Sequence, residues 1–437
     1  MRRESFPPAS LAWLVWGLGA CLYLIAFYQR VAPAVITREL SRDFGLSAAA
    51  LGNLSAFYFY GYVAAQIPTG LLADRWGPRK VLTAGAALTA AGTLLFALAP
   101  TVAWANAGRL AIGAAAGVAF VSMLKLASHW MPAKRYAFAS GLALFMGVMG
   151  ATLAGVPLRA AVEAYGWRSV MIASAVVTAL VSIAILAIAR DDPAERGYSS
   201  YYPGGTGAQS LVSMGASLRE VLSYRNTWLL FFAPGAFSGI VLTFAGLWGV
   251  PFLVANHGFT TAGAAATASA MLVSWSVASI GYGALSERIG ARKPILMLGL
   301  VATTVLWAAV LFAPGLTGAA LVALLIAVGI ASAAFIVVFA FAKESVPARL
   351  GGTVSGIANM GVMLGGLLMQ PLVGFVLDRN WSGALSEGAR VYDSAAYRWG
   401  FAATLVWCVI AFVLLLFTRE SHCRPFQDAG EGRSIRR

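Results

Sequence analysis

Residues 70–80 read Gly70-Leu-Leu-Ala-Asp-Arg-Trp-Gly-Pro-Arg-Lys80, and residues 283–293 read Gly283-Ala-Leu-Ser-Glu-Arg-Ile-Gly-Ala-Arg-Lys293. The two stretches share two glycines, an acidic residue followed by arginine, and a closing Arg-Lys pair, and they lie 213 residues apart. A second pair of segments, Phe120 to Gly141 and Phe335 to Gly356, aligns without gaps at an offset of 215. Two matches at nearly the same offset indicate that the chain contains an internal duplication.

Long apolar runs surround both copies. The chain has 437 residues, of which 59% are hydrophobic and 11% charged, and its mean hydropathy is +0.77. A soluble domain carries about 25% charged residues, so this composition argues against a cytosolic enzyme. We predict an integral membrane protein embedded in a lipid bilayer, because twelve runs are long enough to cross one as helices. They lie at roughly 11–35, 48–73, 81–99, 103–127, 136–160, 168–190, 227–254, 262–285, 294–313, 316–342, 352–377 and 397–418.

The positions of lysine and arginine predict how the chain crosses the membrane. If both termini are cytoplasmic, 21 of the 31 cations lie in cytoplasmic segments and 7 lie on the opposite side. Such an excess is typical of the cytoplasmic side. The net charge of +14 therefore reflects membrane topology and predicts no nucleic-acid partner. We expect a multi-pass monomer in a bacterial inner membrane with both termini in the cytoplasm.

The longest cytoplasmic stretch separates the two copies. Its first part, 198–207, is rich in Gly, Ser, Tyr and Pro and predicts a flexible linker, while 217–228 predicts a short amphipathic helix on the membrane surface. We expect an N-terminal six-helix bundle over 1–195, the linker with its helix over 196–226, and a second bundle with a cytoplasmic tail over 227–437. The predicted fold is all-α, with twelve transmembrane helices in two pseudo-symmetric six-helix bundles, which is typical of transporters.

Two motifs carry a resemblance to a known family. The pattern G-x-L-x-D-R-x-G-x-R-K at 70–80 resembles the cytoplasmic signature of the major facilitator superfamily, and Arg109-x-x-x-Gly113-x-x-x-Gly117 resembles its fourth-helix motif. With the twelve runs and the repeat, the resemblance covers the whole chain. It implies alternating access, in which the first motif and its second copy form a conformational gate: Gly70, Asp74, Arg75, Gly77, Arg79, Lys80, Glu287 and Arg288.

The chemistry of this gate follows from where its charges stand. Asp74 ends the second run, and the eleventh run begins on the same side near Gly352. A carboxylate there would stabilise the positive N-terminal end of that helix by about 0.3–1 kcal/mol. Gly77 permits a tight turn, and the following cations would hold the loop at the anionic inner surface. The simpler alternative is that these charges only anchor a loop.

Arg30 is the most informative charge within a run. Tyr23, Phe27 and Arg30 share one helical face, so aromatic surface and a guanidinium point together into the bundle. Arginine is well suited to bind a carboxylate or phosphate through two parallel hydrogen bonds. The organic-anion and organophosphate branch that the chain resembles carries a substrate-binding arginine on this helix. The alternative is an arginine that extends to the outer membrane interface.

Further candidates lie in other apolar runs. The glycines after Arg109 would let another helix approach closely. The resemblance implies that Arg109 takes part in proton coupling. The alternative role for Arg109 is an internal hydrogen-bond anchor. Six more residues are candidates for substrate contact, with packing as the alternative for each: Tyr58, Tyr62, Trp248, Trp275, Asn359 and Gln370.

The predicted membrane runs contain no Asp or Glu at mid-span, and this makes some classes of transporter less expected. All 17 acidic residues fall in loops, tails or helix ends, which lowers the expectation of a sugar symporter or a carrier of cationic drugs. We expect a secondary active transporter that imports a small carboxylate-bearing solute, an organic acid or amino acid, by alternating access with protons as the coupling ion. The alternatives are an exporter of hydrophobic or drug-like compounds and a membrane receptor.

Enzyme, cofactor and metal signals are missing from the sequence. There is no HExxH, GxSxG or GxxxxGK motif, so we expect no enzyme activity. Cys21, Cys408 and Cys423 form no CxxC pair, so we expect neither a metal site nor a cofactor.

Overall fold

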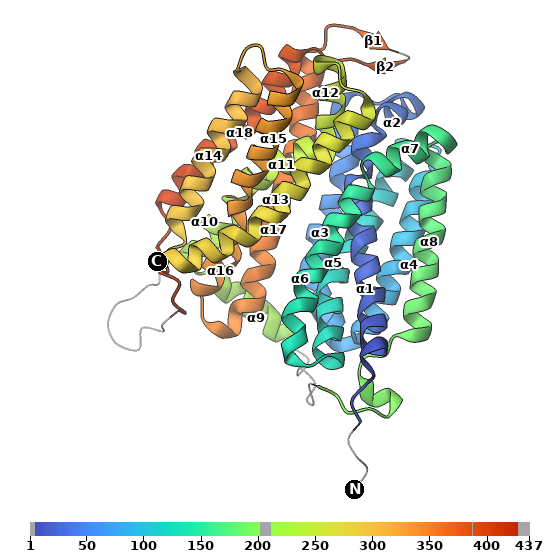
Figure 1. Cartoon of the computed structure of the whole chain (residues 1–437), viewed down its shortest axis with the longest axis vertical. Coiled ribbons are helices and arrows are strands. Elements are labelled where there is room, and N and C mark those ends of the chain that lie inside the picture. The colour runs from blue at the N-terminus through green and yellow to red at the C-terminus, as the bar shows by residue number, and fades with distance from the viewer. Residues whose placement is uncertain (1–4, 202–210, 387, 427–437) are drawn as a thin grey trace. The chain divides into compact units, whose positions relative to one another are not determined.

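The chain folds almost entirely into helices (Figure 1). The computed structural model describes residues 5–201, 211–386 and 388–426. The first half contains α1 (Ala9–Val31), η1 (Ala32–Val35), α2 (Thr37–Phe44), α3 (Ala48–Trp76), α4 (Pro78–Ala97), α5 (Val102–Trp130), α6 (Ala133–Leu153), α7 (Val156–Tyr165), α8 (Trp167–Ile188) and η2 (Pro193–Arg196). The second half contains α9 (Leu211–Val221), α10 (Arg225–Phe232), α11 (Pro234–Thr243), η3 (Phe244–Trp248), α12 (Gly249–His257), α13 (Thr261–Ile289), α14 (Lys293–Phe312), α15 (Gly318–Ser332), η4 (Ala333–Ile336), α16 (Val337–Glu344), η5 (Ala348–Leu350), α17 (Gly351–Arg379) and α18 (Ser394–Leu416).

The helices follow the predicted apolar runs. Among the described residues, eleven helical stretches are long and apolar enough to cross a membrane. They coincide with eleven of the twelve predicted runs, and the remaining run, 48–73, lies in α3, which is 29 residues long. Helices are the expected outcome in lipid, because each backbone N–H and C=O is then satisfied within its own segment. The predicted all-α membrane fold is confirmed.

The helices form two compact units. One contains Met1–Ala32 and Phe57–Leu211, and the other contains Pro33–Ala56 and Val212–Arg437. The helix α3 therefore begins in the second unit and continues in the first. The physical reason is that its first residues pack against α17, where backbone meets backbone at glycine. The predicted boundaries at 195 and 226 remain predictions.

Small side chains allow the helices of the first unit to pack closely. In this unit α1 packs on α5, α6 and α8, and α4 packs on α5 and α8. The core between them includes Ala20, Ala119, Met123 and Trp130, each fully buried. Small residues permit helices to approach closely, which is the usual basis of helix association in membranes.

The seventh span, in the second unit, departs from a regular helix. It is assembled from α10, α11, η3 and α12, and η3 is a short π-helix. Around it, α11 packs on α17 and α18, while α13 and α14 pack on α15. A two-stranded hairpin of β1 (Leu385–Ser386) and β2 (Ala389–Arg390) follows α17 (Figure 1). π-Helical segments often mark functional positions in helices.

The segment between the halves differs from its prediction in detail. The predicted amphipathic helix, 217–228, is divided between α9 and α10, because a turn at Leu222 to Tyr224 interrupts it. Arg349 holds α9 to the second unit through paired bonds to Glu220, one of them 2.7 Å long. The predicted flexible linker at 198–207 lies largely outside the described residues.

Candidate functional site

Arg30 lies in the last turn of α1, on the face that also carries Tyr23 and Phe27. Its guanidinium carbon is 3.8 Å from the centre of the Phe27 ring, and the Tyr23 and Phe27 rings are 4.8 Å apart. The arginine is 6% exposed, and its Nε is buried without a hydrogen-bond partner among the described residues. No carboxylate pairs with it in that part of the chain. A buried cation in this condition is costly until an anion reaches it.

Two further residues fix the end of α1 beneath Arg30. The buried Arg109 of α5 donates from Nη1 to the carbonyl oxygen of Gln29 at 2.6 Å. The hydroxyl of Tyr58 donates to the carbonyl oxygen of Ala26 at 3.1 Å. The Gln29 carbonyl lies in the last turn of α1, and the residue four positions on is Pro33, which has no N–H, so Arg109 supplies the missing donor. The Tyr58 bond to Ala26 adds a second contact, and together they fix the position of Arg30.

The aromatic residues of α3 extend the same cluster. Tyr58 and Tyr62 are stacked with ring centres 6.3 Å apart, and the guanidinium carbon of Arg109 is 5.3 Å from the Tyr58 ring centre. Tyr58 is fully buried, whereas Tyr62 is partly exposed. The structure therefore brings Arg30, Tyr23, Phe27, Tyr58, Tyr62 and Arg109 together in one unit.

A glycine contact sets how closely α3 and α5 approach. A Cβ atom at Gly113 would overlap the carbonyl oxygen of Tyr58, whereas one at Gly117 would lie 3.7 Å from its nearest neighbour, an ordinary contact. Only the first glycine of the fourth-helix motif is thus required for close approach. This contact places the Tyr58 ring against Arg109.

The candidates of the second unit form separate groups. Trp275 is stacked on Phe335 with ring centres 4.6 Å apart, and its Nε1 is buried without a partner among the described residues. The Trp248 Nε1 donates to the backbone oxygen of Gln370 at 3.0 Å, and the Gln370 side chain donates to the Leu242 oxygen at 2.8 Å. These two bonds join the seventh span to α17, one at the π-helix η3 and one at the end of α11. Asn359 is half-buried on α17.

The motif at 70–80 is anchored within its own unit. Gly77 turns the chain with a φ of +81°, and a Cβ there would overlap the Asp191 carboxylate. That carboxylate accepts the backbone N–H of Arg79 at 2.6 Å, while the Arg79 side chain donates to the oxygen of Leu186 at the end of α8. Burial raises the pKa of Asp191 above its ordinary value.

The remaining residues of the motif lie around this turn. Arg75 and Lys80 are exposed. The surroundings of Gly70 and the side chain of Asp74 lie outside what the structure describes, and the proposed contact of Asp74 with the eleventh helix remains a prediction.

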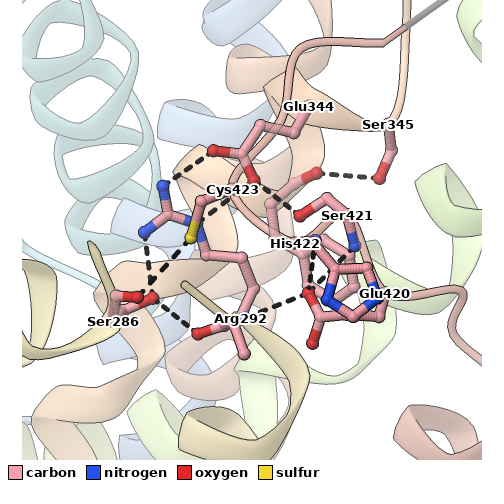
Figure 2. A network of polar contacts seen from close by, with 10 residues as sticks. Ser286, Arg292, Glu344, Ser345, Glu420, Ser421, His422 and Cys423 are labelled. Carbon is pink, nitrogen blue, oxygen red and sulfur yellow. Dashed lines mark hydrogen bonds and ion pairs between the residues drawn. The ribbon is translucent and has the colours of Figure 1, made fainter. Parts of the chain in front are cut away.

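The second copy is anchored in the same way. The Glu420 carboxylate, which follows α18, accepts the backbone N–H groups of Arg292 at 3.0 Å and Lys293 at 2.7 Å. The Arg292 side chain lies between Ser286 and Glu344 (Figure 2). Its Nη2 donates to the Glu344 carboxylate at 2.7 Å. In each half an acid after the last helix therefore caps the helix that follows the motif. Glu287 and Arg288 are exposed.

Replacing Glu420 with glutamine is expected to lower the free energy of unfolding by about 1–3 kcal/mol at pH 7, because two charge-assisted hydrogen bonds weaken. Burial favours the protonated form, but four backbone N–H donors outweigh it and hold the Glu420 pKa below its ordinary value. The stabilisation is therefore present above the ordinary glutamate pKa and is lost as the pH falls through the lowered value. Thermal unfolding of both proteins in detergent at pH 7 and near pH 3 measures the difference.

Glu163 provides the matched control for this change. It pairs with Arg159 on the surface of α7, and its side chain is 57% exposed. Exposed pairs contribute little, so Glu163→Gln should change stability by less than about 0.5 kcal/mol. Equal effects of the two substitutions at pH 7 would contradict the role of Glu420.

Sequence reasoning missed several residues that hold these groups. Each accepts a hydrogen bond from a residue more than 75 positions away in the sequence. The acceptor is the backbone carbonyl in Gln29 and the side-chain carboxylate in Asp191, Asp378 and Glu420. The one sequence signal that could have led to them is the repeat of the motif, because equivalent motifs favour an equivalent carboxylate contact in each half. The pairing itself depends on which helix ends meet.

Comparison with known proteins gives the family. The family model described as Major Facilitator Superfamily matches residues 15–370 and 249–436. The chain belongs to the major facilitator superfamily. Members of this superfamily are membrane transporters, so the chain is a multi-pass transporter, and the expectation that it is no enzyme is confirmed by its family and relatives.

Individual relatives agree with the superfamily assignment. The chain is 24% identical over 392 residues to the probable sulfoacetate transporter SauU of Cupriavidus necator, covering 84% of this chain and 88% of that protein. It is 33% identical over 129 residues to the probable anion transporter 3 of Arabidopsis thaliana, which covers 29% of this chain and 25% of that protein. Among solved structures, a bacterial homologue of the lysosomal transporter Spinster superposes with a TM-score of 0.77 at 18% identity, covering 94% and 97% of the two chains. This last likeness supports the major facilitator fold.

Proposed function

We propose that this protein is a secondary active transporter of a small organic anion. The observation that carries the proposal is the Arg30 guanidinium, which is buried and pairs with no carboxylate among the described residues. Burying an unpaired charge costs several kcal/mol, and a transported anion would remove that cost when it binds. Arginine favours a carboxylate, because its planar donors match two oxygens at once.

The relatives support the same class of solute. SauU is named as a probable sulfoacetate transporter, and the Arabidopsis thaliana protein as a probable anion transporter. Both names describe anions, in agreement with the charge of the site around Arg30. The carboxylate-bearing solute predicted from the sequence is one member of this class.

In this proposal the neighbours of Arg30 hold it in place. Arg109 and Tyr58 fix the C-terminal part of α1, so Arg109 acts as a positioning residue. Tyr23, Phe27 and Tyr62 supply aromatic surface for the apolar part of the solute. The proton-coupling role of Arg109 is a second part of the proposal, as are the solute contacts of Trp275 and Asn359.

Transport would proceed by alternating access. Asp74 and the cations of the motif would govern opening at the cytoplasmic end, with both termini in the cytoplasm of a bacterial cell. Import with protons is the direction and coupling that we propose. The cation distribution supports the orientation.

Uptake by reconstituted protein tests this function. Purified protein in liposomes is given a labelled panel of sulfonates, carboxylates and amino acids, with and without an inward proton gradient. We expect one organic anion to accumulate, and to accumulate more with the gradient. Folded protein that moves none of these anions would contradict the proposal.

An exporter of hydrophobic compounds is the second candidate. The observation that favours it is the aromatic surface: Trp275 stacks on Phe335, and Tyr23 contacts Phe27 edge to face. Such surface binds apolar solutes without needing Arg30. Efflux of a fluorescent hydrophobic cation or neutral dye from the same liposomes, together with no anion uptake, would support the exporter.

A further inference from the structure

The helices α3 and α17 carry the same ending. The sequence Gly70-Leu-Leu-Ala-Asp74-Arg75 closes α3 and Gly374-Phe-Val-Leu-Asp378-Arg379 closes α17, and a glutamine and a proline precede the glycine in both. Both helices have 29 residues with the proline inside. In the topology proposed above, α3 ends in the cytoplasm and α17 ends on the opposite side. The G-x-x-x-D-R pattern therefore stands at both ends of the transporter.

At the end of α17 the side chains are described, and Asp378 binds the start of α3. Its carboxylate accepts the backbone N–H of Ala48 at 3.0 Å and that of Ala49 at 2.8 Å. Tyr392 donates its hydroxyl to the same carboxylate at 2.7 Å, and Arg390 donates from Nη1 at 3.1 Å. We call this group of five residues the α3–α17 clasp. A carboxylate at a helix N-terminus is stabilised by the unpaired N–H groups and by the helix dipole.

Backbone contact brings the two helices together at the clasp. A Cβ at Gly374 would overlap the carbonyl oxygen of Ala48, and one at Gly52 would overlap that of Gln370. The clasp belongs to the second unit, but α3 enters the first unit at Phe57. The clasp therefore holds the beginning of a helix whose remainder belongs to the other unit.

Tyr392 keeps its donor over the physiological pH range. Burial, and then its hydrogen bond to Asp378, raise the pKa of Tyr392 above its ordinary value. Arg390 bonds directly to the Asp378 carboxylate, while Arg42 of α2, near Gly388, pairs with Asp43.

We propose that Asp378 is a positioning residue for transport, whose release of the α3 N-terminus opens the solute pathway at the non-cytoplasmic end. The inference rests on alternating access as proposed above. In this proposal, opening at that end moves the first turns of α3 away from α17, against which they pack. While Asp378 binds Ala48 and Ala49, this movement must break two charge-assisted bonds, so the clasp stabilises the state closed at that end.

Labelling of a buried cysteine tests the clasp without any solute. Cys21, Cys408 and Cys423 are replaced by serine, and Ser55 of α3, which is fully buried, is replaced by cysteine. In proteoliposomes, a membrane-impermeant maleimide added from the non-cytoplasmic side then reports opening there. We expect Asp378→Asn to raise the labelling rate of S55C on the order of 10-fold. Asp378→Glu should restore much of the slow rate, because it keeps the carboxylate.

Asp393 provides a matched control. Its carboxylate caps the N-terminus of its own helix, α18, by accepting the N–H of Ala396 at 2.8 Å, and it bonds to no second helix among the residues that the structure describes. Asp393→Asn should leave the labelling rate within about twofold of the parent. The proposal is overturned if Asp378→Asn leaves labelling unchanged, or if both substitutions accelerate it equally. Since no solute is involved, these outcomes are independent of whether the transported compound is an anion.

Discussion

Alanine in place of Arg30 is expected to weaken binding of the transported anion by about 100-fold or more, because it removes the guanidinium that we propose pairs with the solute. Truncating one partner of a buried charge pair costs about 2–5 kcal/mol. The ligand-free protein should keep or gain thermal stability, since Arg30 is buried without a carboxylate partner among the described residues. Equilibrium binding of the labelled anion to purified protein, with thermal unfolding of the same samples, measures both effects.

Two other variants separate binding from positioning. Arg30→Lys keeps the charge but not the two-pronged donor geometry, so binding should be intermediate. Arg109→Ala removes the bond to the Gln29 carbonyl but leaves Arg30 present, so it should weaken binding less than Arg30→Ala and should lower thermal stability. Full binding by Arg30→Ala would contradict the role of Arg30 as the anion-binding residue. An equally strong loss of binding in Arg109→Ala, without loss of stability, would identify Arg109 as that residue instead.

Gly113→Ala is expected to abolish folded yield or to lower stability by about 3 kcal/mol or more. The added Cβ would overlap the carbonyl oxygen of Tyr58 on α3, and that neighbour is backbone rather than a movable side chain. Overpacking typically costs about 1–3 kcal/mol even where side chains can adjust. Separating α3 from α5 would also break the contact of Tyr58 with Ala26. Fluorescence-detected gel filtration and thermal unfolding measure yield and stability.

Gly117→Ala is the control from the same motif. Its Cβ would meet its nearest neighbour at 3.7 Å, an ordinary contact. Alanine is the better helix former by about 1 kcal/mol, so this variant should fold as well as the parent or better. Similar losses for both variants would contradict the glycine contact as the cause.

By itself the sequence determined the fold, because its signals are local. Lipid offers no partner for backbone groups, so each apolar run of sufficient length must form its own helix. The repeat of residues 70–80 at 283–293 predicts two halves, and the face shared by Tyr23, Phe27 and Arg30 followed from helical spacing. The structure keeps those three side chains together.

Tertiary structure alone decided what each polar group binds. Arg109 was visible in the sequence as a charge within an apolar run, but its partner, the Gln29 carbonyl, lies 80 residues away. Trp248 and Gln370 looked alike as candidates, yet each bonds to backbone of the other's segment. Asp378 appeared only as a helix-end acid, although it binds the N-terminus of a helix some 330 residues earlier. Such contacts depend on which helix ends lie together in space, and the local sequence around each residue does not predict this arrangement.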